Sequence, residues 1–273
     1  MNLKARHNLN FTIGKQFVNF GGYEYYVNSI RVREFSEFNN LLTAYQAGIS
    51  GNWQVSPDHE LCFQIVNNRN GNDEDIYPTG LPEGTAKAKI PFMYTVNWNS
   101  YYLDKTLQLR YATAVGQQTR KRYSYYFTCG NTYEKGPLLT YLDVMYTRQG
   151  IDQHGVVSRL PGTPHTAMNT EYLSIIGDVD YRVHPQWNVY VKGAYETARV
   201  YKSNGDFRKG MYRRSWNAQS SVEFFPFKQL DLFVFVLYTY RGVILEKAAT
   251  RMGAIEPDTH RISLGLVYSI PVF

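Results

Sequence analysis

The sequence predicts an all-β fold, namely an antiparallel up-and-down transmembrane β-barrel to which this chain contributes about twelve strands. Three observations lead to this prediction. Apolar and polar residues alternate with a period of two over many segments, which is the period of a strand. Short and long connections alternate along the chain. The last segment, 258–273, alternates in the same way and stops on the aromatic residue Phe273.

The composition favours a membrane wall over a soluble core. The 273 residues include 24 Tyr, 15 Phe and 4 Trp, so that 16% are aromatic, while the mean hydropathy is only −0.40. These rings are spread along the alternating segments, as in the aromatic girdles of a barrel. A tyrosine-rich soluble β-sandwich is the alternative, but its aliphatic face would be covered by a second sheet. No apolar run approaches the roughly 18 residues of a membrane helix, so a spanning chain must form a closed barrel.

Strands are marked by this alternation, and turns by Pro, Gly, Asn and Asp. The expected strands lie near 6–15, 41–54, 59–68, 88–99, 105–116, 121–130, 137–148, 170–183, 186–200, 210–225, 229–242 and 259–273.

The connections separate into two classes. Tight turns are expected at 56–58, 103–105, 184–185 and 226–228. Long polar loops are expected at 16–40, 69–87, 149–168, 201–209 and 243–258. Short turns at one end and long loops at the other are typical of transmembrane barrels, in which the short turns are periplasmic. The connection 117–120 is short for the loop end, and 131–136 is a little long for the turn end.

The alternation also assigns a face to each residue. In 229–241, Leu232, Val234 and Val236 share the face expected to meet lipid. In 187–196, Val191 faces outward and Lys192 inward by the same rule. Charged residues fall almost wholly on the inward face, as a membrane requires, because a charge near the midplane costs about 2–4 kcal/mol. Phe273 breaks the phase of the final strand unless Pro271 marks a bulge.

The charge pattern points to a polar channel. The net charge is +6 and the isoelectric point is about 9.1, without the clustered basic face of a nucleic-acid-binding protein. Rings of Arg or Lys select anions in pores. We identify six candidate pore-lining, anion-contacting residues: Arg31, Arg33, Arg110, Lys192, Arg213 and Arg241. Inward carboxylates are also expected, at Asp143, Asp178, Asp180, Glu196, Glu223 and Asp231. The mixture predicts mild selectivity.

The segment 16–40 is the longest expected connection and the least loop-like. It carries Gly21-Gly22, a tyrosine cluster, and then Arg31 and Arg33. Long loops with structure of their own are often functional. One interpretation is a loop folded into the lumen that narrows the pore within a single barrel domain, 1–273. The other is an extracellular cap.

Signals for other chemistry are weak. The sequence lacks the HExxH, GxSxG and GxGxxG motifs, and the grouping of Asp152, His154 and Ser158 in one loop is the best remaining enzymatic candidate. The acidic run 72–75 lacks the spacing of a calcium loop. Cys62 and Cys129 are expected to be free thiols, three strands apart. We therefore expect no enzyme activity, no metal and no cofactor.

Three stretches of the chain resemble a known family. They are the run FTIGKQFVNFGGYEY at 11–25, the strand LLTAYQAGISGNW at 41–53, and the strand ELCFQIVNNRNG at 60–71. They look like the phosphate-selective porin O and P family, especially its Bacteroidetes members. The resemblance implies a sixteen-stranded trimeric barrel with a signal peptide and a channel lined by Arg and Lys. Since this chain supplies about twelve strands, we expect about four N-terminal strands and the signal peptide to lie outside it.

Together these observations predict a bacterial outer-membrane porin, a passive diffusion channel for small solutes with a mild preference for anions, phosphate among them. The expected partners are outer-membrane lipid and lipopolysaccharide, small anionic solutes, and further copies in a trimer or other envelope proteins, but not nucleic acid. The alternative is an occluded outer-membrane barrel that serves in adhesion or as a subunit of an envelope complex.

Overall fold

The structure is a computed structural model of the chain. It describes residues 2–6, 8–26, 36, 45–68, 77, 79–86, 88–153, 155–160, 163, 165–227 and 232–268. Five features of the sequence analysis lie outside these residues. They are Arg31 with Arg33, the acidic run 72–75, His154, Asp231, and the chain end with Pro271 and Phe273.

Within the described residues the chain forms thirteen strands and three short helices. The strands are β1 (Asn2–Arg6), β2 (Leu9–Phe17), β3 (Tyr45–Ser56), β4 (His59–Asn67), β5 (Phe92–Tyr102), β6 (Leu107–Thr119), β7 (Arg122–Lys135), β8 (Leu138–Ile151), β9 (Met168–His184), β10 (Trp187–Val200), β11 (Gly210–Phe224), β12 (Leu232–Leu245) and β13 (Thr259–Tyr268). The helices are α1 (Tyr23–Tyr26), η2 (Val157–Arg159) and α4 (Lys247–Thr250).

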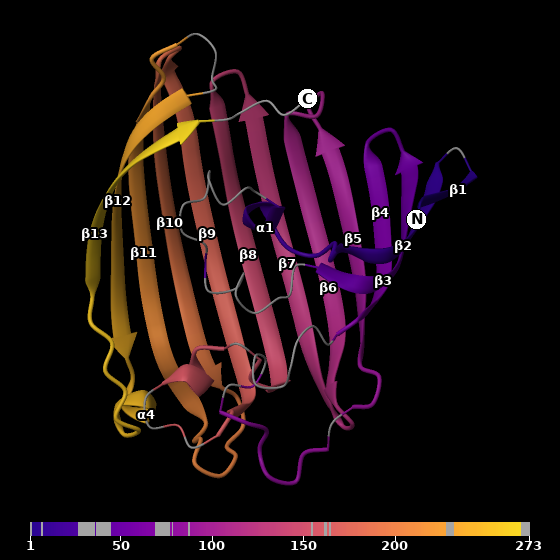
Figure 1. Cartoon of the computed structure of the whole chain (residues 1–273), viewed down its shortest axis with the longest axis vertical. Coiled ribbons are helices and arrows are strands. Elements are labelled where there is room, and N and C mark those ends of the chain that lie inside the picture. Colours follow the sequence, from indigo (N-terminus) through magenta and orange to yellow (C-terminus); the bar gives the residue numbers. More distant parts are fainter. Residues whose placement is uncertain are drawn as a thin grey trace.

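All thirteen strands belong to one antiparallel sheet in which each strand pairs with its neighbours in sequence. The order runs from β1 to β13 without a crossover, which is the up-and-down arrangement predicted from the sequence. The sheet forms a tall curved wall, and α1 lies on its concave side near mid-height (Figure 1). The predicted all-β barrel fold is therefore confirmed.

Twelve of the strands correspond to the twelve predicted segments. The thirteenth, β1, was missed because the expected strand 6–15 straddles the turn that separates β1 from β2. The turn between β7 and β8 is tighter than expected, since β7 runs on to Lys135 and only 136–137 connect the two strands. Gly136 has a φ of 58° there, a left-handed conformation that favours glycine.

The two faces of the wall sort by polarity as predicted. On β10, Val191 is 51% exposed on the convex face, whereas its neighbour Lys192 is 2% exposed on the concave face. On β12, Val234 and Val236 are exposed, and Leu237 between Val236 and Tyr238 is buried. Away from the loop end the convex face thus carries a nearly continuous apolar surface, while charged residues such as Arg148 and Arg199 lie on it near that end. This is the pattern of a wall that meets lipid.

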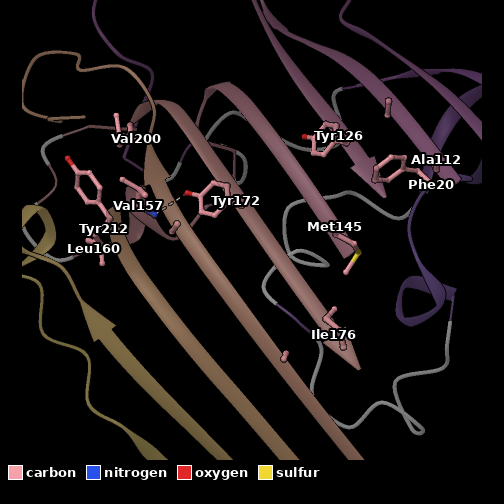
Figure 2. Packing of buried hydrophobic residues seen from close by; sticks show 14 of the residues in the cluster. Phe20, Ala112, Tyr126, Met145, Val157, Leu160, Tyr172, Ile176, Val200 and Tyr212 are labelled. Carbon is pink, nitrogen blue, oxygen red and sulfur yellow. Dashed lines mark hydrogen bonds between the residues drawn. The ribbon is translucent and has the colours of Figure 1, made fainter. Parts of the chain in front are cut away.

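The concave face carries a hydrophobic cluster near the loop end. Figure 2 shows Val157 and Leu160, from the β8–β9 connection, near Tyr172 and Tyr212 of the wall. The backbone N–H of Val157 donates to the hydroxyl of Tyr172 at 3.2 Å. Long-loop segments therefore fold onto the inner side of the wall and occupy part of the space that the sheet surrounds.

Both cysteines are free thiols, as predicted. Cys62 on β4 is buried on the concave face, and Cys129 on β7 is half-buried three strands away.

Candidate pore constriction

Residues 18–26 form an inward segment that leaves β2 and lies against the concave face of β7 and β8 (Figure 1). The segment bends at Gly21, whose φ of 121° suits glycine, and then forms the single turn α1. At Gly22 a side chain would collide with the carboxylate of Asp143 on β8. The pair Gly21-Gly22 thus allows the backbone to approach the wall closely.

Asp143 fixes the start of α1. Its Oδ1 accepts the backbone N–H of Tyr23 at 2.9 Å, and its Oδ2 accepts that of Glu24 at 2.8 Å. Gly130, the partner of Asp143 in the β7–β8 register, leaves room for this contact, because a Cβ at 130 would lie 2.7 Å from Oδ1. Hydrogen bonds to an ionised acceptor are the strong kind, worth about 1.5–3 kcal/mol each.

Glu24 then joins the inward segment to a third strand. One carboxylate oxygen forms an ion pair with Nζ of Lys192 on β10. The other accepts hydrogen bonds from the backbone N–H of Ser36 at 3.1 Å and from its hydroxyl at 2.6 Å. Glu24 is fully buried and Lys192 almost so. The positive charge of Lys192 is thereby offset by a carboxylate.

Tyr26, at the end of α1, lies beneath the guanidinium group of Arg110 on β6. The guanidinium carbon is 4.0 Å from the ring centroid, a cation–π arrangement. Nε of Arg110 donates to Oδ1 of Asn99 at 3.1 Å. Nη1 of Arg110 is buried and finds no hydrogen-bond acceptor among the described residues. Burial raises the pKa of Tyr26 above its usual range, and the nearby charge of Arg110 acts in the opposite direction.

Aromatic contacts fill the space between the inward segment and the wall. Ring centroids lie 5.7 Å apart for Phe20 and Tyr126, and 4.9 Å apart for Tyr23 and Tyr141. The hydroxyl of Tyr26 donates to Oδ1 of Asn19 at 2.6 Å. The segment is therefore packed as part of the protein interior.

Two of the predicted cations lie together nearer the loop end. Nη2 of Arg213 on β11 is 2.8 Å from Oε1 of Glu256, and Nη2 of Arg241 on β12 is 3.3 Å from the same oxygen. They border a cavity of about 310 Å³ that Leu160 and Ile255 also line. Arg159 lines the same cavity, so three guanidinium groups and the carboxylate of Glu256 lie around it.

A buried carboxylate organises the β8–β9 connection. Oδ2 of Asp152 accepts the backbone N–H of Ser158 at 2.8 Å and its hydroxyl at 2.7 Å, and Oδ1 accepts the hydroxyl of Tyr172 at 2.7 Å. Burial raises the pKa of Asp152, although these hydrogen bonds oppose the shift. The Asp152–Ser158 pair considered as an enzymatic candidate is a buried structural contact in the loop.

Four of the six predicted pore residues fall within the described chain, and each has partners that the sequence did not reveal. Arg110 contacts Tyr26, Lys192 contacts Glu24, and Arg213 and Arg241 share Glu256. Arg31 and Arg33 belong to the part of the chain that the structure does not describe.

Sequence reasoning did not identify Glu24, Tyr26 and Glu256 as site residues, or the contact of Asp143 with α1. The pair Gly21-Gly22, followed by the tyrosine cluster, could have indicated a segment whose backbone closely approaches the wall. Among the described residues, no cluster of His, Cys, Asp and Glu has the arrangement of a metal site. No helix in the described part of the chain has the length and apolarity needed to cross a membrane.

Comparison with known proteins identifies the family. Residues 2–270, nearly the whole chain, match the profile of the family described as phosphate-selective porin O and P. The chain belongs to this family. The resemblance noted in the sequence is therefore confirmed, and the protein is a porin-family β-barrel of the bacterial outer membrane. None of the curated proteins compared with the chain matches it.

Solved outer-membrane barrels share the fold of this porin-family chain. The outer-membrane channel DcaP of Acinetobacter baumannii aligns with a TM-score of 0.62 and 10% identity over 96% of this chain and 72% of DcaP. OmpT of Vibrio cholerae aligns with a TM-score of 0.56 and 12% identity over 96% of this chain and 77% of OmpT. A structure of OmpT described as its trimer form gives a TM-score of 0.55 at 12% identity, over 96% of this chain and 77% of OmpT.

Proposed function

We propose that the protein is a passive diffusion channel for small solutes, with a mild preference for anions that includes phosphate. Transport would follow the solute gradient and would involve no covalent step and no cofactor. Family membership supports the channel. The observation that supports the anion preference is Arg110, a concave-face guanidinium at the inward segment whose contacts among the described residues are with Tyr26 and Asn99 and include no ion pair.

The preference is mild because carboxylates offset part of the charge of the other described cations. Lys192 pairs with Glu24, and Arg213 and Arg241 share Glu256. Mixed charge of this kind is ordinary in a general porin. We further propose that the whole segment 16–40, with Arg31 and Arg33, narrows the channel, since residues 18–26 lie on the concave face. A trimeric assembly, in contact with outer-membrane lipid and lipopolysaccharide, is proposed by analogy with the trimer form of OmpT.

The test is reconstitution into planar bilayers with measurement of the reversal potential in a potassium chloride gradient. A unit charge about 6 Å from a permeating ion in a water-like medium contributes about 0.7 kcal/mol. R110Q disfavours chloride and favours potassium by about this amount each, so it should lower the chloride-to-potassium permeability ratio roughly tenfold. R120Q, an equal charge change at the exposed β6–β7 turn, serves as the control and should leave the ratio within its scatter.

Two outcomes would contradict the proposal. Equal ratios for R110Q and R120Q would remove Arg110 as the source of the preference. A folded protein that gives no conductance steps would instead favour the occluded barrel of an adhesion or envelope-complex protein. The loop segments packed on the concave face, such as Val157 and Leu160, would then account for the closed lumen.

A further inference from the structure

A charged row crosses the convex face of the wall near its loop end. Arg148 on β8 is directly opposite Glu171 on β9, and Glu171 is directly opposite Arg199 on β10. On the other side of Arg148, the register places Tyr125 of β7. The four residues thus form one row across four neighbouring strands. We call Arg148, Glu171 and Arg199 the outer arginine row.

Both arginines are held by the same carboxylate. Nε of Arg148 lies 3.7 Å from Oε1 of Glu171, and Nε of Arg199 lies 3.2 Å from Oε2. The hydroxyl of Tyr146 donates to Oε1 of Glu171 at 3.0 Å, and the guanidinium of Arg148 lies 3.8 Å above the ring of Tyr201. Glu171 is thereby fixed between the two guanidinium groups, which orients both of them.

The outer arginine row carries a net positive charge on exposed side chains. Two guanidinium groups and one carboxylate give it a net charge of about +1. The side chains of Arg148 and Arg199 are 48% and 44% exposed, whereas that of Glu171 is only 14% exposed. A guanidinium has five N–H donors, which is more than the contacts at Nε with Glu171 and the hydrogen bond between Arg148 and Tyr201 occupy.

The position of the row matches a lipid headgroup layer. Arg148 lies three residues before the end of β8, and Glu171 three residues after the start of β9, which is about 10 Å from the strand ends at the loop side. Toward mid-wall, the following convex-face positions on β9 are Leu173 and the exposed Ile175. The long-loop end of a bacterial barrel is extracellular. The row therefore stands at the outer boundary of the apolar surface.

We propose that the outer arginine row binds a phosphate group on the headgroup of an outer-leaflet lipid, whose acyl chains lie on the apolar wall below. Arginine forks match the geometry of phosphate oxygens, and charge-assisted hydrogen bonds of this kind are strong. The convex face is reached from the membrane, which favours a lipid-borne phosphate over a free one. The site lies on the opposite face of the wall from the channel residues.

The experiment uses the full folded chain in detergent and measures lipid binding by native mass spectrometry. The probes are diphosphorylated lipid A, the same lipid with its phosphates removed, and inorganic phosphate. R148Q/R199Q should weaken binding of the phosphorylated lipid about tenfold, the effect of losing one strong charge-assisted contact. E171Q should strengthen binding about threefold, because it removes the competing negative charge while the amide oxygen still accepts a hydrogen bond from an arginine.

R214Q is the matched control. Arg214 on β11 is also on the convex face and 43% exposed, but its charge is paired one to one with Glu246 at 2.5 Å. Binding by R214Q should stay within about twofold of the unchanged protein, a difference of about 0.4 kcal/mol. Heat-dependent electrophoretic mobility checks that each variant is folded. If R148Q/R199Q does not fold, the binding of phosphorylated lipid A by E171Q tests the proposal on its own.

Three results would overturn the proposal. Equal binding of phosphorylated and dephosphorylated lipid would show that acyl contacts alone hold the lipid. Displacement of the lipid by inorganic phosphate at equal affinity would make the row a small-anion site. Unchanged binding in E171Q would show that the row does not contact the headgroup.

Discussion

Lys192 shows how a single buried partner can cancel the charge that a pore residue would offer to a permeating ion. Its position on the concave face follows from the alternation of β10, and a lysine in a channel wall would ordinarily attract anions. Glu24 lies against its Nζ and cancels that charge. Removing one member of a buried ion pair leaves the other charge uncompensated, which is costly. The two residues therefore act on selectivity and on stability as a unit.

The pair predicts a double-mutant cycle for selectivity. E24Q should raise the chloride-to-potassium permeability ratio roughly tenfold, because the uncompensated charge of Lys192 favours chloride and disfavours potassium in the channel. K192Q should lower the ratio by a similar factor, since it leaves the carboxylate of Glu24. The double variant E24Q/K192Q should return close to the starting value. Reversal potentials measure all three, and a double variant that keeps the shift of either single variant would show that the two charges do not offset each other in the channel.

This pairing was beyond the reach of the sequence. Glu24 and Lys192 are 168 residues apart, and Tyr23 and Asp143 are 120 apart. Alternation fixes the face on which a strand residue lies, but nothing in a period-two pattern says which loop residue will meet it. The inward placement of Arg110 and Lys192 could therefore be predicted from the alternation. The neutralisation of Lys192 by Glu24 could not.

At the scale of elements, the strands were predictable because each carries two independent signals, the alternation and the turn residues at its ends. β1 had neither in full, since its five residues are too few to establish a period. The inward segment follows different rules. Its path depends on Gly21 and Gly22, on the acceptor Asp143, and on the small residue Gly130 opposite. The two glycines indicate that the segment can approach another backbone closely. They do not indicate which strand of the wall it approaches.

The close approach at Gly22 yields a prediction for the inward segment. In G22A, the added Cβ would collide with the carboxylate of Asp143, which is held by the N–H groups of Tyr23 and Glu24. We expect the segment to move away from the wall and into the channel. Single-channel conductance should fall, and the free energy of unfolding should drop by about 2 kcal/mol through weakened charge-assisted hydrogen bonds.

G193A is the control for this substitution, because a Cβ at 193 on β10 would meet no atom within 4 Å. Its conductance and its urea unfolding curve in detergent should match those of the unchanged protein. If G22A also behaved like the unchanged protein, the segment would be able to shift without narrowing the channel or losing its contacts.

At the scale of the whole molecule, the polarity of the convex face reflects the solvent that surrounds the protein. Val191 on β10 and Val183 on β9 are both exposed there, at 51% and 54%. Val191 lies well inside its strand, whereas Val183 lies one residue from the end of β9. In water these two valines would be equivalent. In a bilayer they differ in depth, and the cost of a charge depends on depth.

Depth dependence therefore distinguishes a membrane wall from the uncovered face of a soluble sheet. V191K should lower the free energy of unfolding in lipid vesicles by about 2–4 kcal/mol, and V183K by about 0–1 kcal/mol. Denaturant unfolding followed by tryptophan fluorescence measures both. In each variant a lysine replaces a strand valine of similar exposure. The change in strand propensity and the change in net charge are therefore the same in both. Equal losses for the two variants would mean that lipid does not cover this face, because only a bilayer makes the outcome depend on where along the strand the lysine lies.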